Sequence, residues 1–177
     1  MKETIWIGMI TACAMILISC GSNPTSAQQP ITVTMRNPYG GIVGNAVLTA
    51  DPAGGVHMSI QVASLAPGKH GIHIHISGKC EGFDFASAGA HFNPDSKQHG
   101  AQNPQGAHAG DLPNLVVAAD GTGTYEHTNK VVSFGAGPNS LFKPDGTALV
   151  IHANEDDEKT DPTGNSGGRI SCGVLVR

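Results

Sequence analysis

The stretch Gly71-Ile72-His73-Ile74-His75-Ile76 alternates isoleucine with histidine. Such an alternation is typical of a β-strand, in which successive side chains point to opposite faces. We therefore expect the imidazoles of His73 and His75 to leave one face of a strand while the isoleucines fill the other face. Two nitrogen ligands would converge there without an intervening loop, and imidazole suits copper and zinc. The stretch thus predicts a strand that carries part of a metal site.

Short alternating or β-branched runs continue this pattern on both sides of the stretch. They cover residues 31–35, 42–49, 56–62, 70–76, 114–118, 123–128, 148–152 and 169–176, and turn signals rich in glycine, proline, asparagine or aspartate separate them. The 177 residues include 24 glycines and 11 prolines but only five Phe, two Tyr and one Trp. One turn-rich, all-β domain is therefore expected, a sandwich or flattened barrel of eight strands.

Two polar, glycine-rich segments, 77–113 and 153–168, interrupt the rhythm of strands. Loops of this length in a compact domain are usually functional. The further candidate metal ligands are in or beside them: His91, His99, His108, Asp111 and His152. Histidines with a single carboxylate exclude the all-oxygen sites of calcium and magnesium. Three imidazoles and one carboxylate are a set that closes tetrahedrally around zinc.

Five segments in sequence order carry a family resemblance. They are His70-Gly71-Ile72-His73-Ile74-His75, Ala88-Gly89-Ala90-His91-Phe92-Asn93-Pro94, His108-Ala109-Gly110-Asp111-Leu112, Val150-Ile151-His152 and Gly164-Asn165-Ser166-Gly167-Gly168-Arg169-Ile170-Ser171-Cys172-Gly173. Together they resemble the copper/zinc superoxide dismutase family, and the match runs from about Ile31 to the C-terminus. The resemblance implies a Greek-key arrangement of the eight strands, with residues 31–177 as the catalytic domain.

The resemblance also implies a role for each site residue. One copper ion would be held by His73, His75, His91 and His152, and one zinc ion by His91, His99, His108 and Asp111. His91 is then a shared ligand, and with Arg169 it would be catalytic. Asp156 would orient His73 and His99 by accepting their hydrogen bonds, while Thr163 matches a residue at the rim of the substrate channel. His57, His70 and His127 fall outside the ligand set and are expected to be structural.

The implied activity is conversion of superoxide to dioxygen and hydrogen peroxide by cycling of copper between Cu(II) and Cu(I). A non-catalytic metal-binding module of the same fold is the alternative, but all four copper ligands are present. A zinc hydrolase is a third interpretation, which lacks a His-Glu-x-x-His arrangement. Segment 153–168 carries five acids against one lysine, a sum of −4 that opposes attraction of an anion. The formal charge of −4 of the whole chain gives no indication of a nucleic-acid partner, and the sequence predicts no particular oligomeric state.

The N-terminus resembles a bacterial lipoprotein signal. Residues 4–19 are mostly apolar and uncharged, and they end in Leu17-Ile18-Ser19-Cys20. We expect residues 1–19 to be removed and Cys20 to carry lipid, so that residues 20–30 form a polar tether to a membrane. The predicted location is the extracytoplasmic side of a bacterial cell envelope. An ordinary secretory peptide with an incidental cysteine is the alternative.

Only Cys80 and Cys172 remain in the folded part once the leader is removed. A single pair of cysteines in an exported domain predicts a disulfide, although a pair of reduced buried thiols is the other interpretation. In the family that the chain resembles, the equivalent pair ties the loop before the bridging histidine to the final strand.

Overall fold

The computed structural model describes residues 29–177. The predicted leader, Cys20 and most of the tether lie outside this range. The described part contains eight strands and one short 3-10 helix: β1 (Ile31–Arg36), β2 (Ile42–Ala50), β3 (Val56–Val62), β4 (Gly68–His75), η1 (Ala86–Ala88), β5 (Asp111–Val117), β6 (Gly123–Asn129), β7 (Thr147–His152) and β8 (Arg169–Leu175). No helix within residues 29–177 is long and apolar enough to cross a membrane.

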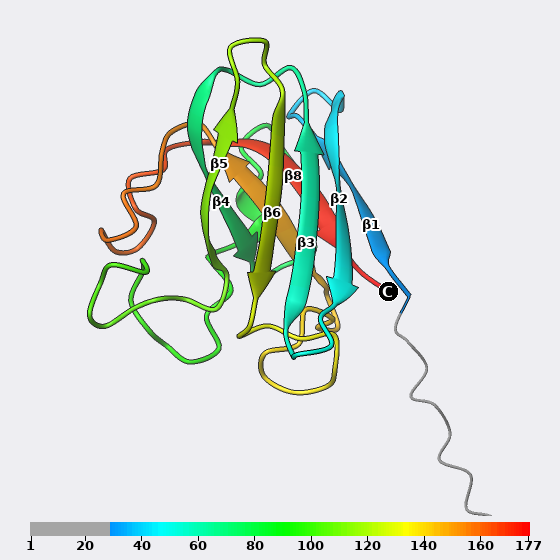
Figure 1. Cartoon of the computed structure of the whole chain (residues 1–177), viewed down its shortest axis with the longest axis vertical. Coiled ribbons are helices and arrows are strands. Elements are labelled where there is room, and N and C mark those ends of the chain that lie inside the picture. Colours follow the sequence, from blue (N-terminus) through cyan, green and yellow to red (C-terminus); the bar gives the residue numbers. More distant parts are fainter. Residues whose placement is uncertain (1–28) are drawn as a thin grey trace, which may run out of the picture.

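The strands form one antiparallel sheet in the order β5-β4-β7-β8-β1-β2-β3-β6. The two outermost strands, β5 and β6, also contact each other, so the sheet curls into a flattened barrel (Figure 1). The chain passes from β3 to β4 and from β6 to β7 without pairing those strands, and these two crossings make the topology a Greek key. The all-β prediction is confirmed.

Each predicted strand is present, with ends that differ by at most three residues. The largest difference is at β5, which begins at Asp111 rather than Asn114 because Asp111 pairs with His73 and Leu112 with Ile72. A candidate metal ligand therefore lies inside the sheet and not in a loop. Residues 130–146 form a third long connection, between β6 and β7, that the sequence pattern did not indicate.

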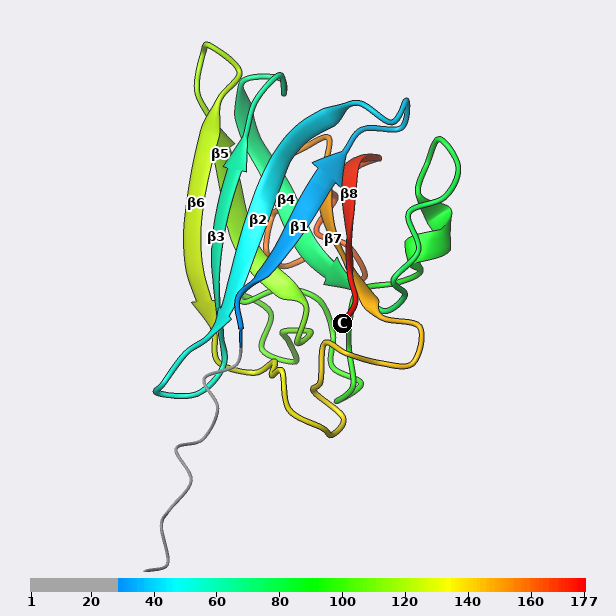
Figure 2. The same ribbon diagram turned by 90° about the vertical axis from the view of Figure 1, so that its right-hand side faces the viewer.

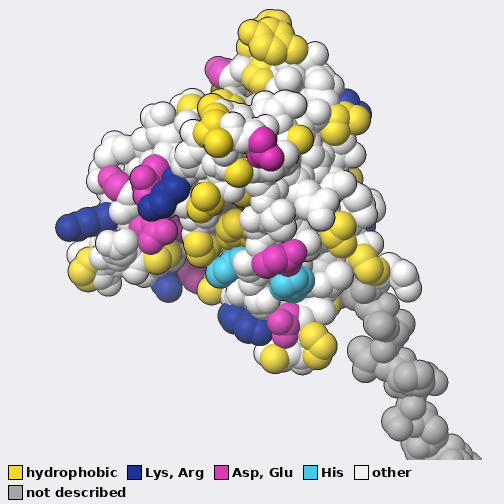
Figure 3. Space-filling model, turned by 45° about the horizontal axis from the view of Figure 1, so that its top comes forward, with side chains coloured by type: hydrophobic (Ala, Val, Ile, Leu, Met, Phe, Trp, Pro, Cys, Tyr) yellow, Lys and Arg dark blue, Asp and Glu magenta, His cyan; other side chains and the backbone are white. Residues whose placement is uncertain are grey.

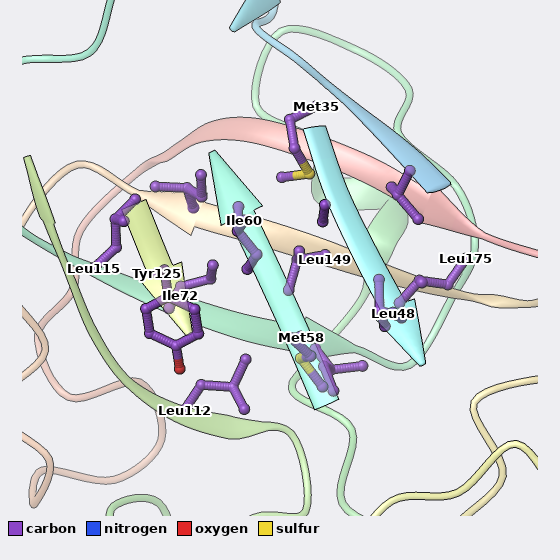
Figure 4. Packing of buried hydrophobic residues seen from close by; sticks show 14 of the residues in the cluster. Met35, Leu48, Met58, Ile60, Ile72, Leu112, Leu115, Tyr125, Leu149 and Leu175 are labelled. Carbon is purple, nitrogen blue, oxygen red and sulfur yellow. The ribbon is translucent and has the colours of Figure 1, made fainter. Parts of the chain in front are cut away.

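Alternating side chains of the strands fill the barrel (Figure 4). Met58, Ile60, Leu149 and Leu175 are fully buried, as are Ile72 and Ile74 of β4. The burial of each such side chain contributes about 1.5–3 kcal/mol to folding. The isoleucines of β4 thus point into the core as predicted, and His73 and His75 point to the other face. That outer face is also buried, because the two long loops cover it.

Cys80 and Cys172 form a disulfide with their Cα atoms 5.7 Å apart. The bond joins β8 to the segment that contains η1, which projects from the barrel beside β7 and β8 (Figure 2). This confirms the predicted pairing.

Candidate metal centre

Neighbouring strands bring the first group of histidines together. His73 and His75 lie on β4, and His152 ends the adjacent strand β7. The loop after β4 returns His91 to the same place, where it forms an isolated bridge with His75. One ring nitrogen from each of the four histidines lies within 4.8 Å of the others, and all four side chains are buried. This group has the membership that was predicted for copper.

The hydrogen bonds of these rings determine which nitrogen faces the group. His73 donates from Nε2 to Oδ2 of Asp156 at 2.6 Å. His75 and His152 donate from Nδ1 to the carbonyl oxygens of Gly89 (2.9 Å) and Gly167 (3.2 Å). His73 therefore offers Nδ1, while His75 and His152 offer their Nε2 atoms, which lie 3.3 Å apart. A hydrogen bond to the ring nitrogen that does not face the metal is the usual way in which a metal-binding imidazole is held in one orientation.

The second group converges on Asp111. The Nδ1 atoms of His91, His99 and His108 lie 2.9, 3.1 and 3.1 Å from its Oδ1 atom. Tetrahedral zinc with bonds of about 2.0–2.1 Å places its ligand atoms roughly 3.3 Å apart, so this spacing fits a zinc shell. Oδ2 accepts hydrogen bonds from the backbone N–H groups of Gly100 and His108, which fixes the carboxylate. His73 also lies within 4.8 Å of His91, His99 and Asp111, so the two groups adjoin.

His91 lies between the two groups, with Nδ1 toward Asp111 and Nε2 toward the first group. Nε2 of His91 is buried and has no hydrogen-bond partner, and the same holds for Nδ1 of His73 and Nδ1 of His99. Buried polar atoms are rarely left without a partner, since that costs about 1–3 kcal/mol each. Three such nitrogens at the centre of two ligand sets fit a pair of metal ions.

Burial determines the protonation state of the histidines in the first group. Desolvation lowers the pKa of His75 to about 2, of His152 to about 3 and of His91 to about 4. These rings are neutral at neutral pH, which is the form that binds metal. At His99, burial also favours the neutral form, but the adjacent carboxylates of Asp111 and Asp156 outweigh it and raise the pKa to about 9.

Asp156 connects the two groups, because it accepts a hydrogen bond from one histidine of each. Its Oδ2 accepts from His73, and its Oδ1 accepts from His99 Nε2 at 2.9 Å. These hydrogen bonds outweigh burial and hold the pKa of Asp156 well below its usual range. Gly164 packs so closely here that a Cβ atom would collide with Asp156 and His99, and its φ of +61° also favours glycine.

Asn114 of β5 holds Asp156 in place, a role that the sequence did not indicate. Its Nδ2 donates to the carbonyl oxygen of Asp156 and its Oδ1 accepts from the N–H of Asp156, both at 2.8 Å. The two residues are 42 positions apart, so no local pattern could have revealed the contact.

A cavity of about 610 Å³ opens from the first group to the surface and includes Thr163 and Arg169 in its lining. The guanidinium of Arg169 donates to the carbonyl oxygens of Phe85 (2.5 Å) and Gly89 (2.6 Å), which flank η1. A guanidinium has five N–H donors, so others remain for an anion in the cavity.

The three histidines that were predicted to be structural belong to neither metal group among the described residues. Both ring nitrogens of His70 lie 2.8 Å from backbone carbonyl oxygens, those of His152 and Ala66. His57 contacts Glu126 at 3.0 Å on the outer face of β3 and β6.

The fold and the two groups define a β-barrel protein with two adjoining sites for transition metals. Residues 42–175 match the family described as copper/zinc superoxide dismutase (SODC). The chain is 45% identical over 141 residues to superoxide dismutase (Cu-Zn) 1 of Aquifex aeolicus, covering 78% of this chain and 83% of that protein. It is 42% identical over 146 residues to superoxide dismutase-like protein YojM of Bacillus subtilis, covering 81% and 74%.

Two solved structures of related proteins are also similar to this chain in fold and in sequence. A crystal structure of a SOD-like protein from Bacillus subtilis matches with a TM-score of 0.79 at 42% identity, covering 81% of this chain and 97% of that one. Cu/Zn superoxide dismutase from Brucella abortus matches with a TM-score of 0.66 at 29% identity, covering 83% and 99%. The chain belongs to the copper/zinc superoxide dismutase family, as the resemblance predicted. Copper and zinc are the metals that this family implies for the two groups.

Proposed function

We propose that this chain converts superoxide to dioxygen and hydrogen peroxide at the first histidine group, with His73, His75, His91 and His152 as copper ligands. His91, His99, His108 and Asp111 are the zinc ligands. The observation that carries this proposal is the position of His91, whose two ring nitrogens face the two groups. Copper, when bound, supplies a one-electron cycle between Cu(II) and Cu(I) that oxidises one superoxide and reduces the next.

The protein supplies a proton and a binding position. Nε2 of His91 is the atom that can hold a proton next to the cavity, because Nδ1 faces Asp111. A proton held on Nε2 would lie beside the anion in the cavity and could pass to it. Arg169 lines the same cavity and holds the anion within reach of this proton. Asp156 keeps His73 and His99 in the tautomer that leaves their Nδ1 atoms free for metal.

The test is to load the purified domain with copper and zinc, to measure both metals, and to follow the decay of pulse-generated superoxide. We expect a second-order rate near the diffusion limit, as is typical of this enzyme class. Copper bound by the four histidines without superoxide decay would indicate the non-catalytic metal-binding module instead.

We also propose that the chain is an exported lipoprotein of a bacterial cell envelope. The support from the sequence is an apolar leader at residues 4–19 that ends at Cys20, and a polar segment before the first strand. The disulfide is consistent with an oxidising compartment. Labelling with a radioactive fatty acid should mark the full chain and leave a Cys20→Ser variant unmarked. Equal labelling of both would contradict the proposal.

A further inference from the structure

A second cavity, of about 540 Å³, lies outside the metal centre. It is lined by β1 and β8, by the turn between β1 and β2, and by the segment from Cys80 to Phe85. Figure 2 shows this segment to the right of β8, and the turn at the upper end of β1. No described residue of either metal group lines the cavity. Its volume is within the range of about 300–1,000 Å³ that is usual for ligand sites.

Two exposed aromatic residues stand beside this cavity. Phe83 lines it, and Tyr39 belongs to the turn between β1 and β2. They are 75% and 86% exposed, and their ring centroids lie 5.8 Å apart with the ring planes tilted by 55°. Large apolar side chains that meet on the surface next to a cavity are typical of an interaction site.

The backbone that carries each ring is held in place. The N–H group of Tyr39 donates to Oδ1 of Asn37 at 3.0 Å, which fixes the turn. On the other side, the disulfide between Cys80 and Cys172 ties the segment of Phe83 to β8. Rings that are already fixed lose little conformational entropy when a ligand binds between or over them.

The strand β1 adds polar groups to the cavity. Thr32 and Thr34 lie on its exposed face and line the cavity, and neither hydroxyl has a hydrogen-bond partner within residues 29–177. Arg36 follows on the same face and donates from Nη1 to the carbonyl oxygen of Gly40 at 2.8 Å. Its other N–H groups stay available, because a guanidinium has five donors. A ligand with hydroxyl and carboxylate oxygens would find partners for both here.

The charge of the cavity is positive, although the chain carries −4. Arg36 is the charged residue of the described lining. Glu81 and Asp84 belong to the same segment as Phe83 but do not line the cavity, and Oδ1 of Asp84 accepts from the N–H of Ala86 at 3.0 Å. Figure 3 shows many charged side chains at the left, over the long loops, and few at the right, where β1 and β2 lie in Figure 1.

These features together fit a sugar chain better than a protein surface. The C–H groups on one face of a sugar ring carry a slight positive charge and pack against the negative face of an aromatic ring. The sugar hydroxyls can bond to Thr32 and Thr34, and a carboxylate on the sugar can pair with Arg36. An apolar protein surface would bury the same hydroxyls and guanidinium without partners, which is unfavourable.

The position of the cavity agrees with a ligand that lies away from the membrane. β1 runs from Ile31, close to the start of the described chain, to Arg36 beside the cavity. The chain toward Cys20 therefore leaves from one end of β1, and the aromatic pair lies beyond the other end (Figure 2). With the proposed lipid anchor at Cys20, the pair would face the interior of the cell envelope and not the lipid.

We propose that Tyr39, Phe83 and Arg36 form a binding site for a carboxylate-bearing glycan of the bacterial cell wall, with Thr32 and Thr34 as hydrogen-bonding partners. This inference rests on the proposed location in the cell envelope and not on the proposed dismutation. The two cavities share no described lining residue, so the domain can bind the glycan while the metal centre stays open.

The test is co-sedimentation of the full chain in detergent with purified bacterial peptidoglycan sacculi at increasing sacculus concentration. We expect the wild-type protein to bind, and Tyr39→Ala and Phe83→Ala to weaken binding by about three- to tenfold each. Tyr39→Phe and Phe83→Tyr should stay near wild type, because an aromatic ring remains. The matched control is Val116→Ala, which shortens an exposed apolar side chain that does not line the cavity.

A second comparison tests the charge. Arg36→Gln should weaken binding to untreated sacculi about threefold at low salt, and it should match the wild type on sacculi whose carboxylates have been converted to amides. Equal loss on both kinds of sacculi would contradict the pairing of Arg36 with a carboxylate and overturn this site.

Three other results would overturn the proposal: no sedimentation of the wild-type protein, wild-type binding by both alanine variants, or an equal loss in Val116→Ala. Sedimentation equilibrium tests the other possible occupant. A dimer that Phe83→Ala disrupts, with sacculus binding unchanged, would assign this face to a second copy of the chain. Export is tested separately by fatty-acid labelling of the Cys20→Ser variant, so failure of the location and failure of the glycan site can be distinguished.

Discussion

At the scale of single residues, the metal centre depends on side chains that have two partners each. The rings of His73, His75 and His152 each use one nitrogen for a hydrogen bond to the protein and leave the other for the group. His91 has no carbonyl partner of this kind and faces both groups. This difference is the structural reason to assign it the shared role.

Replacing His91 with Ala should lower turnover more than it lowers copper binding. Three nitrogens, from His73, His75 and His152, still face the copper group, but the proton-holding Nε2 is lost. Copper content and superoxide decay of the same preparation give the comparison. A variant that kept wild-type turnover would show that the shared-ligand mechanism does not apply.

Replacing Asp156 with Ala should lower metal affinity or activity by about 10- to 100-fold, because His73 and His99 lose the acceptor that orients them. Chelator competition measures the affinity. Asp157→Ala is the matched control, since Asp157 bonds only within its own loop. Equal zinc retention in both variants would mean that the role of Asp156 is misassigned.

Arg169→Glu should cut the second-order rate by tenfold or more with both metals still bound. The change reverses a charge in the cavity lining and removes donors that can hold an anion there. The measurement is decay of pulse-generated superoxide at several ionic strengths. Wild-type speed in the fully metallated variant would exclude a docking role for this residue.

At the scale of elements, β4 and the disulfide position the centre. β4 lies between β5 and β7, so one strand places two ligands next to Asp111 on one side and His152 on the other. The disulfide holds the segment around η1 against β8, and this segment supplies the carbonyl groups that fix Arg169. The geometry of the cavity thus depends on a covalent bond between two elements.

Reduction of the disulfide should lower the free energy of unfolding and loosen the position of Arg169. The closed loop spans 92 residues, and the entropy of its closure contributes at most about 4 to 5 kcal/mol. Denaturant unfolding with and without reductant measures the change, and thiol labelling confirms the reduction. Two freely reactive thiols in protein from its native compartment would contradict the pairing.

At the scale of the whole molecule, the barrel supports the two long loops that surround the metal centre. The core stabilises the sheet, and the sheet in turn fixes the ends of both long loops. The centre itself opposes folding without metal, because ring nitrogens of His73, His91 and His99 are buried without partners.

Metal removal should therefore destabilise the whole domain. Binding of ions at about 100 times the dissociation constant adds about 3 kcal/mol to the folded state, so the metal-free protein should melt roughly 5 to 15 °C lower. Calorimetry of chelated protein, before and after adding zinc and copper, measures this difference. Calcium is the control, since nitrogen ligands do not suit it. Equal midpoints with and without copper and zinc would contradict the assignment of the buried histidines as ligands.

The sequence by itself determined the strands, the family and the types of ligand. Alternation is a property of neighbouring residues, so the side of β4 that carries His73 and His75 could be predicted without the rest of the chain. The tertiary structure decided which nitrogen of each ring faces a metal and that Asn114 holds Asp156. These features depend on contacts between residues far apart in the chain, such as the 42 positions between Asn114 and Asp156. Local periodicity contains no information on such contacts, because the folding of the loops against the barrel creates them.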